Sequence, residues 1–458
     1  MYREEGGHLM KKINKREIII MIFIFLIFLS FCYSFVGREE ETIANERFTM
    51  LNYDLMMPDL RYAEETMSVE DKWKIEESLA EFDKIYKQAN EALTKRNYKE
   101  YNLNATKLCL LHSLYVYEVY YDHKETSNVD HKLYNERKQL ADLLFKKVGL
   151  NQDDYYFLVK DPLYHAPRVL IWEYPGIVLR ASLYYEQYEK GLPPLSSGSS
   201  DSASSIMHIL EELMPYFLIL IVAIVCLDMV DSDRKQGTLK LLLTQPKKRS
   251  VYLMNKGKLY AKKTALIIFI PLAFTFACIG VQSGFETLSS PVLAYERGLT
   301  NLKNIDNHIN DIHYVYGYDK KIYFSNVLIN PDNPEDMEPQ DEMELIPFWK
   351  LLLAASVFTI LLICFYVSLN LLLHTLISNP IIAALSFLVI AGFGVLISMP
   401  ENACAVYNVL NPFTHRNPIY AITGYTGYSF LFSAIVLLLA TFLINRISVF
   451  FFKRKDIS

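Results

Sequence analysis

The sequence lacks the short motifs that mark most enzymes. It contains no GxxxxGKS/T phosphate-binding loop, no HExxH zinc helix and no GxSxG nucleophile turn. Only six cysteines occur in 458 residues, none of them in a CxxC pair, and they indicate no disulfide framework. The ten histidines are scattered rather than spaced as metal ligands. These absences exclude the commonest catalytic chemistries, and we expect a protein that is not an enzyme and has no cofactor or metal site.

Charge is nearly missing from six long stretches, although charged residues make up 21% of the chain. Each stretch is long enough, at about 17 to 26 residues, for a helix that crosses a hydrocarbon core of about 30 Å. The stretches are residues 18–36, 213–230, 264–281, 348–373, 381–399 and 428–444. Since hydrophobic residues make up 52% of the chain, the sequence predicts an all-α membrane protein with six transmembrane helices.

The first stretch has a rival interpretation as a secretory signal, because a basic start followed by an apolar run is common to both. The run is long for a signal, however, and Phe31, Tyr33 and Phe35 offer no small-residue cleavage site. The bulky Phe31 before Cys32 also departs from a lipoprotein signal. We therefore interpret residues 18–36 as an uncleaved span.

A basic loop between the second and third stretches sets the orientation. Residues 231–263 hold ten lysines and arginines but only two acidic residues, Asp231 and Asp233. Such an excess beside membrane spans is typical of the cytoplasmic side. With six spans, this orientation predicts a multi-pass protein of the cell membrane with both termini in the cytoplasm.

The spans and the orientation divide the chain into five parts. We expect a cytoplasmic N-terminus with the first span (1–36), a large, mostly helical extracytoplasmic domain (37–205), spans two and three with the basic loop (206–282), an acidic extracytoplasmic loop (283–346), and spans four to six (347–458). In span two, Asp228 is either part of a path or, as we favour, a solvated end residue. In span five, Gly392 and Gly394 indicate close helix packing.

Helical periodicity predicts a bundle in the polar part between spans one and two. A capping box starts at Ser68, and apolar residues then recur at helical spacing. Further helices are expected at 103–121, 133–148 and 177–190, with Gly149 and Gly191 closing the last two. The Ser-rich residues 196–205 predict a flexible tether to the second span.

Tyrosine is concentrated in this polar part, for example at Tyr184, Tyr185 and Tyr188. A ligand-binding or headgroup surface is one interpretation, because tyrosine combines an apolar ring with a polar hydroxyl. Core packing together with an aromatic belt at the membrane surface is the other, and we favour it.

The basic loop also contains the pattern of a short helix. Asp231, Ser232 or Asp233 can cap it, Leu239, Leu242 and Leu243 fall at helical spacing, and Pro246 ends it. An amphipathic helix at this position suits either docking into a groove of a soluble partner or lying flat on anionic lipid. The residues alone leave both interpretations open.

The loop resembles the cytoplasmic loop of type-2 ABC transporter permeases. The resemblance rests on an acidic residue, a Gly-Thr-Leu step, a leucine cluster, a proline and a basic-Ser turn before the next span. The matching residues are Asp233, Gly237, Thr238, Leu239, Leu241, Leu242, Leu243, Pro246, Arg249 and Ser250, with Lys256 or Lys258 entering the following helix. Aspartate stands at position 233 where the family usually has glutamate, so the side chain has a shorter reach.

In that family the segment is the coupling helix, which lies in a cleft of a separate ATP-hydrolysing subunit. The resemblance implies a permease subunit of an ATP-driven transporter, more often an exporter, in which coupling falls to Asp233, Gly237, Thr238, Leu239, Leu242, Leu243, Pro246 and Arg249. The implied partners are a cytoplasmic ABC ATPase, a second permease copy or paralogue, and the lipid bilayer, without nucleic acid. Residues 401–427 resemble the re-entrant region that helps close the outer end of the path in this family.

Two other classes of function compete with this one. A membrane-anchored sensor or immunity protein would bind a ligand through the extracytoplasmic domain, but a sensor needs a cytoplasmic output domain and the inner segments are short. A membrane hydrolase would need ionisable residues clustered inside the spans, which are nearly free of them. The sequence identifies no substrate.

Overall fold

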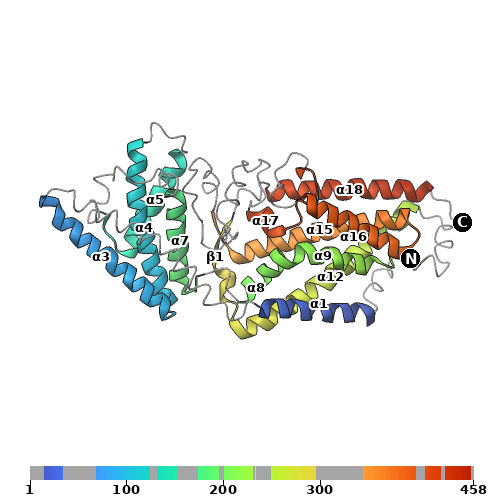
Figure 1. Cartoon of the computed structure of the whole chain (residues 1–458), viewed down its shortest axis with the longest axis horizontal. Helices are drawn as coiled ribbons and strands as arrows, with labels where there is room; N and C mark the ends of the chain where they lie inside the picture. The colour runs from blue at the N-terminus through green and yellow to red at the C-terminus, as the bar shows by residue number, and fades with distance from the viewer. Residues whose placement is uncertain are drawn as a thin grey trace, which may run out of the picture.

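The computed structural model shows a chain built almost wholly of helices in the part that it describes. That part comprises residues 15–34, 69–123, 131–152, 174–194, 201–230, 233, 249–294, 344–398, 408–423 and 429–454. A four-helix unit lies at one end of the molecule and a bundle of long apolar helices at the other (Figure 1).

Six helices in the described part are long and apolar enough to cross a membrane, which agrees with the predicted all-α membrane protein. They are α1 (Lys15–Tyr33), the continuous run Ser202–Cys226 made of α8, η3 and α9, α12 (Arg249–Ser283), α15 (Phe348–Leu376), α16 (Pro380–Ile397) and α18 (Phe430–Arg454). The helices run side by side as one bundle (Figure 1).

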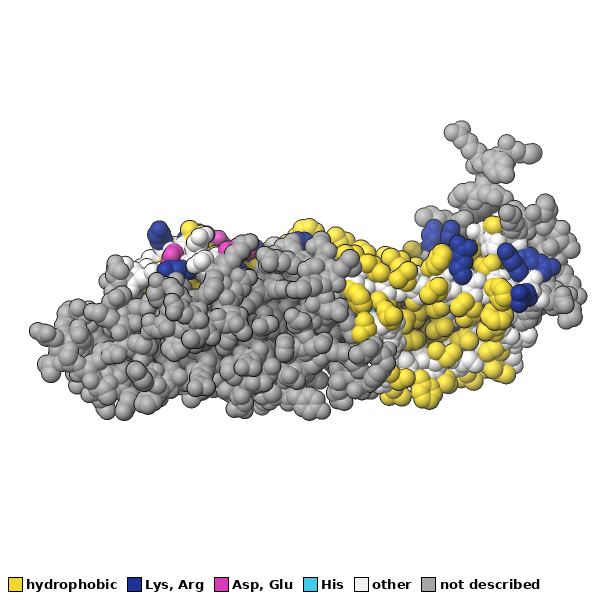
Figure 2. Space-filling view, turned by 90° about the horizontal axis from the view of Figure 1, so that it is seen from above, with side chains coloured by type: hydrophobic (Ala, Val, Ile, Leu, Met, Phe, Trp, Pro, Cys, Tyr) yellow, Lys and Arg dark blue, Asp and Glu magenta, His cyan; other side chains and the backbone are white. Residues whose placement is uncertain are grey.

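Helix α15 lies inside this bundle and packs against α9, α12, α16 and α18. Its residues Phe358, Leu362 and Phe365 are buried, whereas large apolar side chains of the surrounding helices, such as Phe393 on α16, are exposed. Figure 2 shows the result as a broad apolar area on the face of the bundle that it draws. An exposed apolar area of this kind is unfavourable in water and favourable in lipid.

Helix α12 begins far earlier than predicted. It starts at Arg249, about four turns before the expected start of span three at residue 264. No proline interrupts 249–263, and Leu253 and Tyr260 are buried, so packing extends the helix beyond its apolar core despite Gly257. The segment predicted as a loop to residue 263 is therefore helical from Arg249 onward.

The second span also begins earlier than predicted. Asp201 caps helix α8 (Ser202–His208) by accepting hydrogen bonds from the backbone amides of Ala203 and Ser204. The predicted tether is wrong for its last residues, because residues 202–205 are helical and buried. Their small side chains allow close approach, and Ser202 Oγ donates to the backbone oxygen of Gly284 at 2.9 Å. Residues 196–200 lie outside the described part.

The four-helix unit confirms the predicted bundle. It consists of α3 (Val69–Thr94), α4 (Tyr98–His123), α5 (His131–Val148) and α7 (Tyr174–Lys190), which share one apolar core. Gly149 and Gly191 follow α5 and α7 with φ of 72° and 65°, the left-handed conformation in which glycine ends a helix at least cost. Ser68 of the predicted capping box lies outside the described part.

The described tyrosines of this unit favour core packing over a ligand surface. Tyr184 and Tyr185 are buried, and the Tyr184 ring meets Tyr101 edge to face at 5.9 Å between centroids. His112 is buried in the same core, where burial and the neighbouring Arg180 charge lower its pKa to about 3. The imidazole is therefore neutral at physiological pH.

A short antiparallel pair of strands was not predicted. Strands β1 (Pro291–Ala294) and β2 (Glu344–Pro347) join the two ends of the acidic segment 283–346, with Val292 opposite Ile346. The pair lies between the four-helix unit and the spans (Figure 1). Lys190 Nζ at the end of α7 donates to the backbone oxygen of Ser289 at 2.9 Å, which links the two parts of the molecule.

The two glycines of α16 differ in their surroundings. A Cβ atom at Gly394 would lie 2.3 Å from the Phe413 ring, whereas no atom of the described residues lies within 4 Å of a Cβ at Gly392. Gly394 is closely packed, but against the Phe413 ring of the outer connection and not against another helix as predicted, and Gly392 has no such neighbour among the described residues.

We expect Gly394→Ala to destabilise the bundle by about 1–3 kcal/mol, since the methyl group would overlap the buried Phe413 ring. Gly392→Ala is the matched control and should be neutral or slightly stabilising, because alanine favours the helix. A thiol-reactive dye can follow thermal unfolding in detergent, because Cys32 and Cys226 are buried in the bundle. Equal melting temperatures for the two variants would contradict the packing described here.

Candidate functional site

The structure describes only two of the residues assigned to coupling. Asp233 and Arg249 are described. The others, Gly237, Thr238, Leu239, Leu242, Leu243 and Pro246, lie outside the described residues. The site is therefore built from the two residues that bracket the loop and from the helix ends around them.

Asp233 contacts the first turns of α12. Its Oδ2 atom lies 2.6 Å from Lys256 Nζ, and the Tyr252 hydroxyl donates a hydrogen bond to the same carboxylate. The Asp233 and Lys256 side chains are mostly buried, so solvent weakens this ion pair less than a surface pair. Aspartate is shorter than the glutamate usual in the family that the loop resembles. In this structure the Asp233 carboxylate contacts two residues of the same chain, Tyr252 and Lys256.

Arg249 and Tyr252 connect the start of α12 to the end of α18. The Arg249 guanidinium donates to the backbone oxygen of Lys453 at 3.4 Å. The Tyr252 ring stacks on Phe452 with an interplanar angle of 21°. A cation beside the last carbonyls of a helix is stabilised by the helix dipole. The two contacts hold the loop's exit against the C-terminal end of the sixth span.

Helix α1 is held at the same end by two further ion pairs. Lys263 Nζ on α12 lies 2.8 Å from Glu17 Oε1, and Arg16 pairs with Asp228, just beyond the end of α9. The Arg16 and Asp228 side chains are each 48% exposed, which agrees with the interpretation of Asp228 as a solvated end residue. These contacts join spans one, two and three beside the loop.

Positive charge is concentrated at this end of the bundle. Figure 2 shows lysine and arginine side chains gathered beyond the apolar area, on the side away from the four-helix unit. The described basic residues at these helix ends are Lys15, Arg16, Arg249, Lys256, Lys258, Lys262, Lys263, Arg446, Lys453 and Arg454. The basic residues that the sequence places beside the apolar stretches are therefore gathered at one end of the folded bundle.

The opposite end of the bundle is closed by a buried polar connection. Between α16 and α18 the described residues form turns and the short helix α17 (Pro418–Thr423), as expected for broken elements. Arg416 donates to the backbone oxygen and to Oγ of Ser398, both at 2.9 Å. Burial lowers the pKa of His415 to about 4. His415 is therefore neutral, and its Nδ1 atom lies 2.9 Å from Ser433 Oγ.

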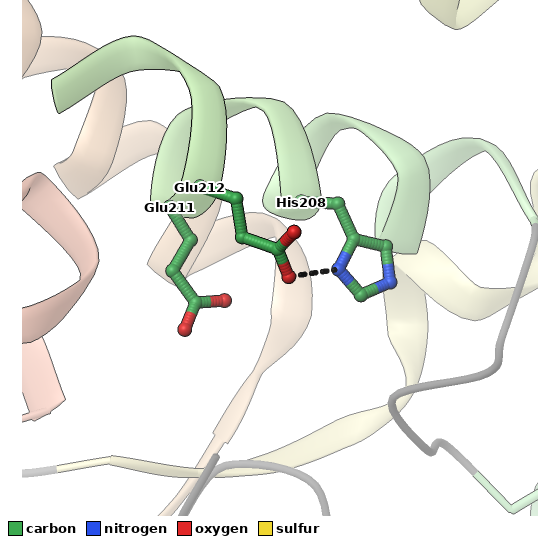
Figure 3. Close-up of side chains that lie close together, drawn as sticks. All are labelled: His208, Glu211 and Glu212. Atoms are coloured by element: carbon green, nitrogen blue, oxygen red, sulfur yellow. Dashed lines mark ion pairs between the residues drawn. The ribbon is translucent and has the colours of Figure 1, made fainter. Parts of the chain in front are cut away.

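The sequence analysis missed a group of possible metal ligands at this end. His208, Glu211 and Glu212 lie on span two, and one ligand atom from each comes within 4.8 Å of the others (Figure 3). The HExxH pattern does not describe them, and the judgement that the histidines are scattered took no account of the two glutamates that follow His208. The separations of three and four residues, which place side chains on one helical face, could have revealed the group.

Comparisons with known proteins add one match. Residues 182–458, which are more than half of the chain, match a protein family model whose description is "Protein of unknown function (DUF2705)". The match includes the second to sixth spans, and it also includes the basic loop and the polar outer connection. The first span lies outside it. No curated protein and no solved structure matches the chain.

We expect Asp233→Asn to lower the stability of the purified protein by about 1–2 kcal/mol, because it removes a mostly buried charge-assisted contact with Lys256 and Tyr252. The matched control, Asp228→Asn, breaks a half-exposed pair and should cost less than about 1 kcal/mol. Thermal unfolding in detergent measures both. An equal loss in the two variants would show that Asp233 does not hold the loop to α12.

Proposed function

The chain belongs to the DUF2705 family, whose function is unknown, and from the loop motif and the apolar helices we propose that it is the permease subunit of an ATP-driven ABC transporter, of the exporter type. Its six apolar helices form a membrane-embedded bundle, and the motif of the loop between the second and third of them resembles a coupling helix. The proposal assigns ATP hydrolysis to a separate cytoplasmic subunit, because the chain has no phosphate-binding loop.

One observation carries the proposal: the loop is attached to α12 at both of its described ends. Asp233 pairs with Lys256 and Tyr252, and Arg249 is itself the first residue of α12. A force on the leucines between them would therefore act directly on α12.

Helix α12 is long enough to carry this motion across the bilayer. Its 35 residues span about 52 Å at 1.5 Å per residue. It contacts α1, α9, α15 and α18, so a tilt of α12 displaces the other spans. Pro271 in its middle lacks a backbone N–H, which loosens the helix at that point. In the proposed cycle, closure of the ATPase tilts α12 and shifts the bundle between inward- and outward-open states.

The orientation follows from the same end of the molecule. We assign the basic helix ends, the loop 231–248 and both termini to the cytoplasm, because lysine and arginine accumulate there. The four-helix unit and the β1–β2 pair then lie outside the cell, as an extracytoplasmic domain between spans one and two. A second copy or a paralogue completes the translocation path in this scheme.

The test is the loss of the ATPase from a docking variant. We expect the tagged wild-type protein, extracted from its native membranes, to carry a protein with a phosphate-binding loop and ATPase activity. Leu242→Asp combined with Leu243→Asp should lower the amount recovered by about tenfold or more, since buried anchors dominate such interfaces. Leu143→Asp is the control, because Leu143 is exposed on α5, and the four-helix unit lies at the other end of the molecule from the start of α12.

Quantitative mass spectrometry of equal amounts of membrane-inserted protein gives the result. Undiminished recovery with the double variant contradicts docking through this loop. Absence of any ATPase from the wild-type preparation contradicts the transporter itself and favours the alternative of a membrane-anchored sensor or immunity protein.

A further inference from the structure

Span two contains a break in its hydrogen bonding, at the end opposite the basic loop. Residues Ile209–Leu213 form the π-helical turn η3, which Met214 separates from Pro215. Proline has no backbone N–H, so the carbonyl of Glu211, four residues earlier, lacks its ordinary helical donor. Asn417 Nδ2 donates to this carbonyl at 3.0 Å instead. A side chain of the outer connection thus secures the irregular turn, and such turns are frequent at functional sites.

The irregular turn carries two of the three side chains of the His208–Glu211–Glu212 group. Figure 3 shows all three on the same side of the helix. Their ligand atoms lie within 4.8 Å of one another, and His208 Nδ1 is 3.7 Å from Glu212 Oε1. Among the described residues, no other group of three or more His, Cys, Asp or Glu side chains brings its ligand atoms within this distance.

The burial of the group distinguishes it from an ordinary acidic surface patch. His208 is fully buried and Glu211 is 4% exposed, although both lie near the end of a membrane span. Two carboxylates beside one imidazole repel each other when both are ionised, and low polarity strengthens that repulsion. A divalent cation removes this cost, because it balances two negative charges and coordinates all three groups.

We propose that His208, Glu211 and Glu212 bind a divalent transition-metal ion, with Zn²⁺ as the representative ion. One imidazole nitrogen and two carboxylate oxygens are ordinary zinc ligands, and metal–ligand distances of about 2.0–2.2 Å require them to approach by small side-chain rotations. Three protein ligands leave a coordination position open for water. Glu212, whose side chain is 39% exposed, lies on the accessible side of the site.

Each residue has a distinct part in this site. The buried His208 and Glu211 are held in place by packing, and the Asn417 hydrogen bond fixes the backbone from which Glu211 projects. Glu212 completes the set from the exposed side. The site depends only on described residues and does not require the chain to be a transporter.

A simple ion pair is the competing explanation. A protonated His208 would pair with Glu212 four residues later without any metal. That pair involves Glu212 and not Glu211, whereas a metal site requires both carboxylates. Glu211 therefore discriminates between the two explanations.

The experiment measures Zn²⁺ binding to the full-length protein in detergent after chelator treatment and buffer exchange. Metal content and titration calorimetry should give one saturable ion per chain. His208→Gln, Glu211→Gln and Glu212→Gln should each weaken binding by about tenfold or more, because each removes a ligand. Glu286→Gln is the matched control. Glu286 is exposed, follows the C-terminal end of α12, and lies outside the His208–Glu211–Glu212 group. This variant should leave binding unchanged.

A second readout separates loss of the site from loss of the fold. The metal-free melting temperature of Glu212→Gln should equal that of the wild type, because Glu212 is partly exposed, and saturating Zn²⁺ should raise only the wild-type value. Co²⁺ in place of Zn²⁺ should give visible absorption bands that disappear in the same variant. Non-saturable binding, or equal binding by the wild type and Glu211→Gln, would overturn the metal site and leave the ion pair as the explanation.

Discussion

The bilayer is the constraint on which the rest of this structure depends. Hydrocarbon offers no hydrogen-bonding partner to the backbone, so the chain crosses it as helices whose peptide groups bond within each segment. Lipid tolerates apolar side chains on the outside of the bundle, such as those of α16, and repels charge. Ionisable groups therefore collect at the two ends of the helices, and the parts of the molecule that we connect with function lie there.

The two ends differ in kind. At the basic end, ion pairs join α1, α9 and α12, and Asp233 ties the loop to the start of α12. At the other end, Pro215 interrupts the hydrogen bonding of span two. Asn417 donates a hydrogen bond to the backbone oxygen of Glu211, which lies near His208. The basic end has the long continuous helix that a mechanical connection needs. The other end has an irregular turn and buried polar groups, which suit the binding of an ion.

Sequence patterns predicted the features that follow from local physics. The spans follow from runs of apolar residues, and the glycines after α5 and α7 follow from helix-ending chemistry. The early starts of α12 and α8, the strand pair and the burial of Glu211 depend on tertiary packing, which periodicity does not record. In the candidate coupling site, the pattern indicated Asp233 but not its partners Tyr252 and Lys256, because they are some twenty residues away in sequence and meet it only through folding.

The central claim is that the loop between spans two and three faces the cytoplasm, with the four-helix unit on the other side. Labelling of intact cells with a membrane-impermeant maleimide tests this directly, using Lys248→Cys in the loop and Lys95→Cys on the exposed surface of the four-helix unit, each against the parent chain. The account predicts that intact cells label the cysteine at position 95, and that the cysteine at position 248 is labelled only after the membrane is opened. Labelling of position 248 in intact cells, with position 95 protected, would contradict it.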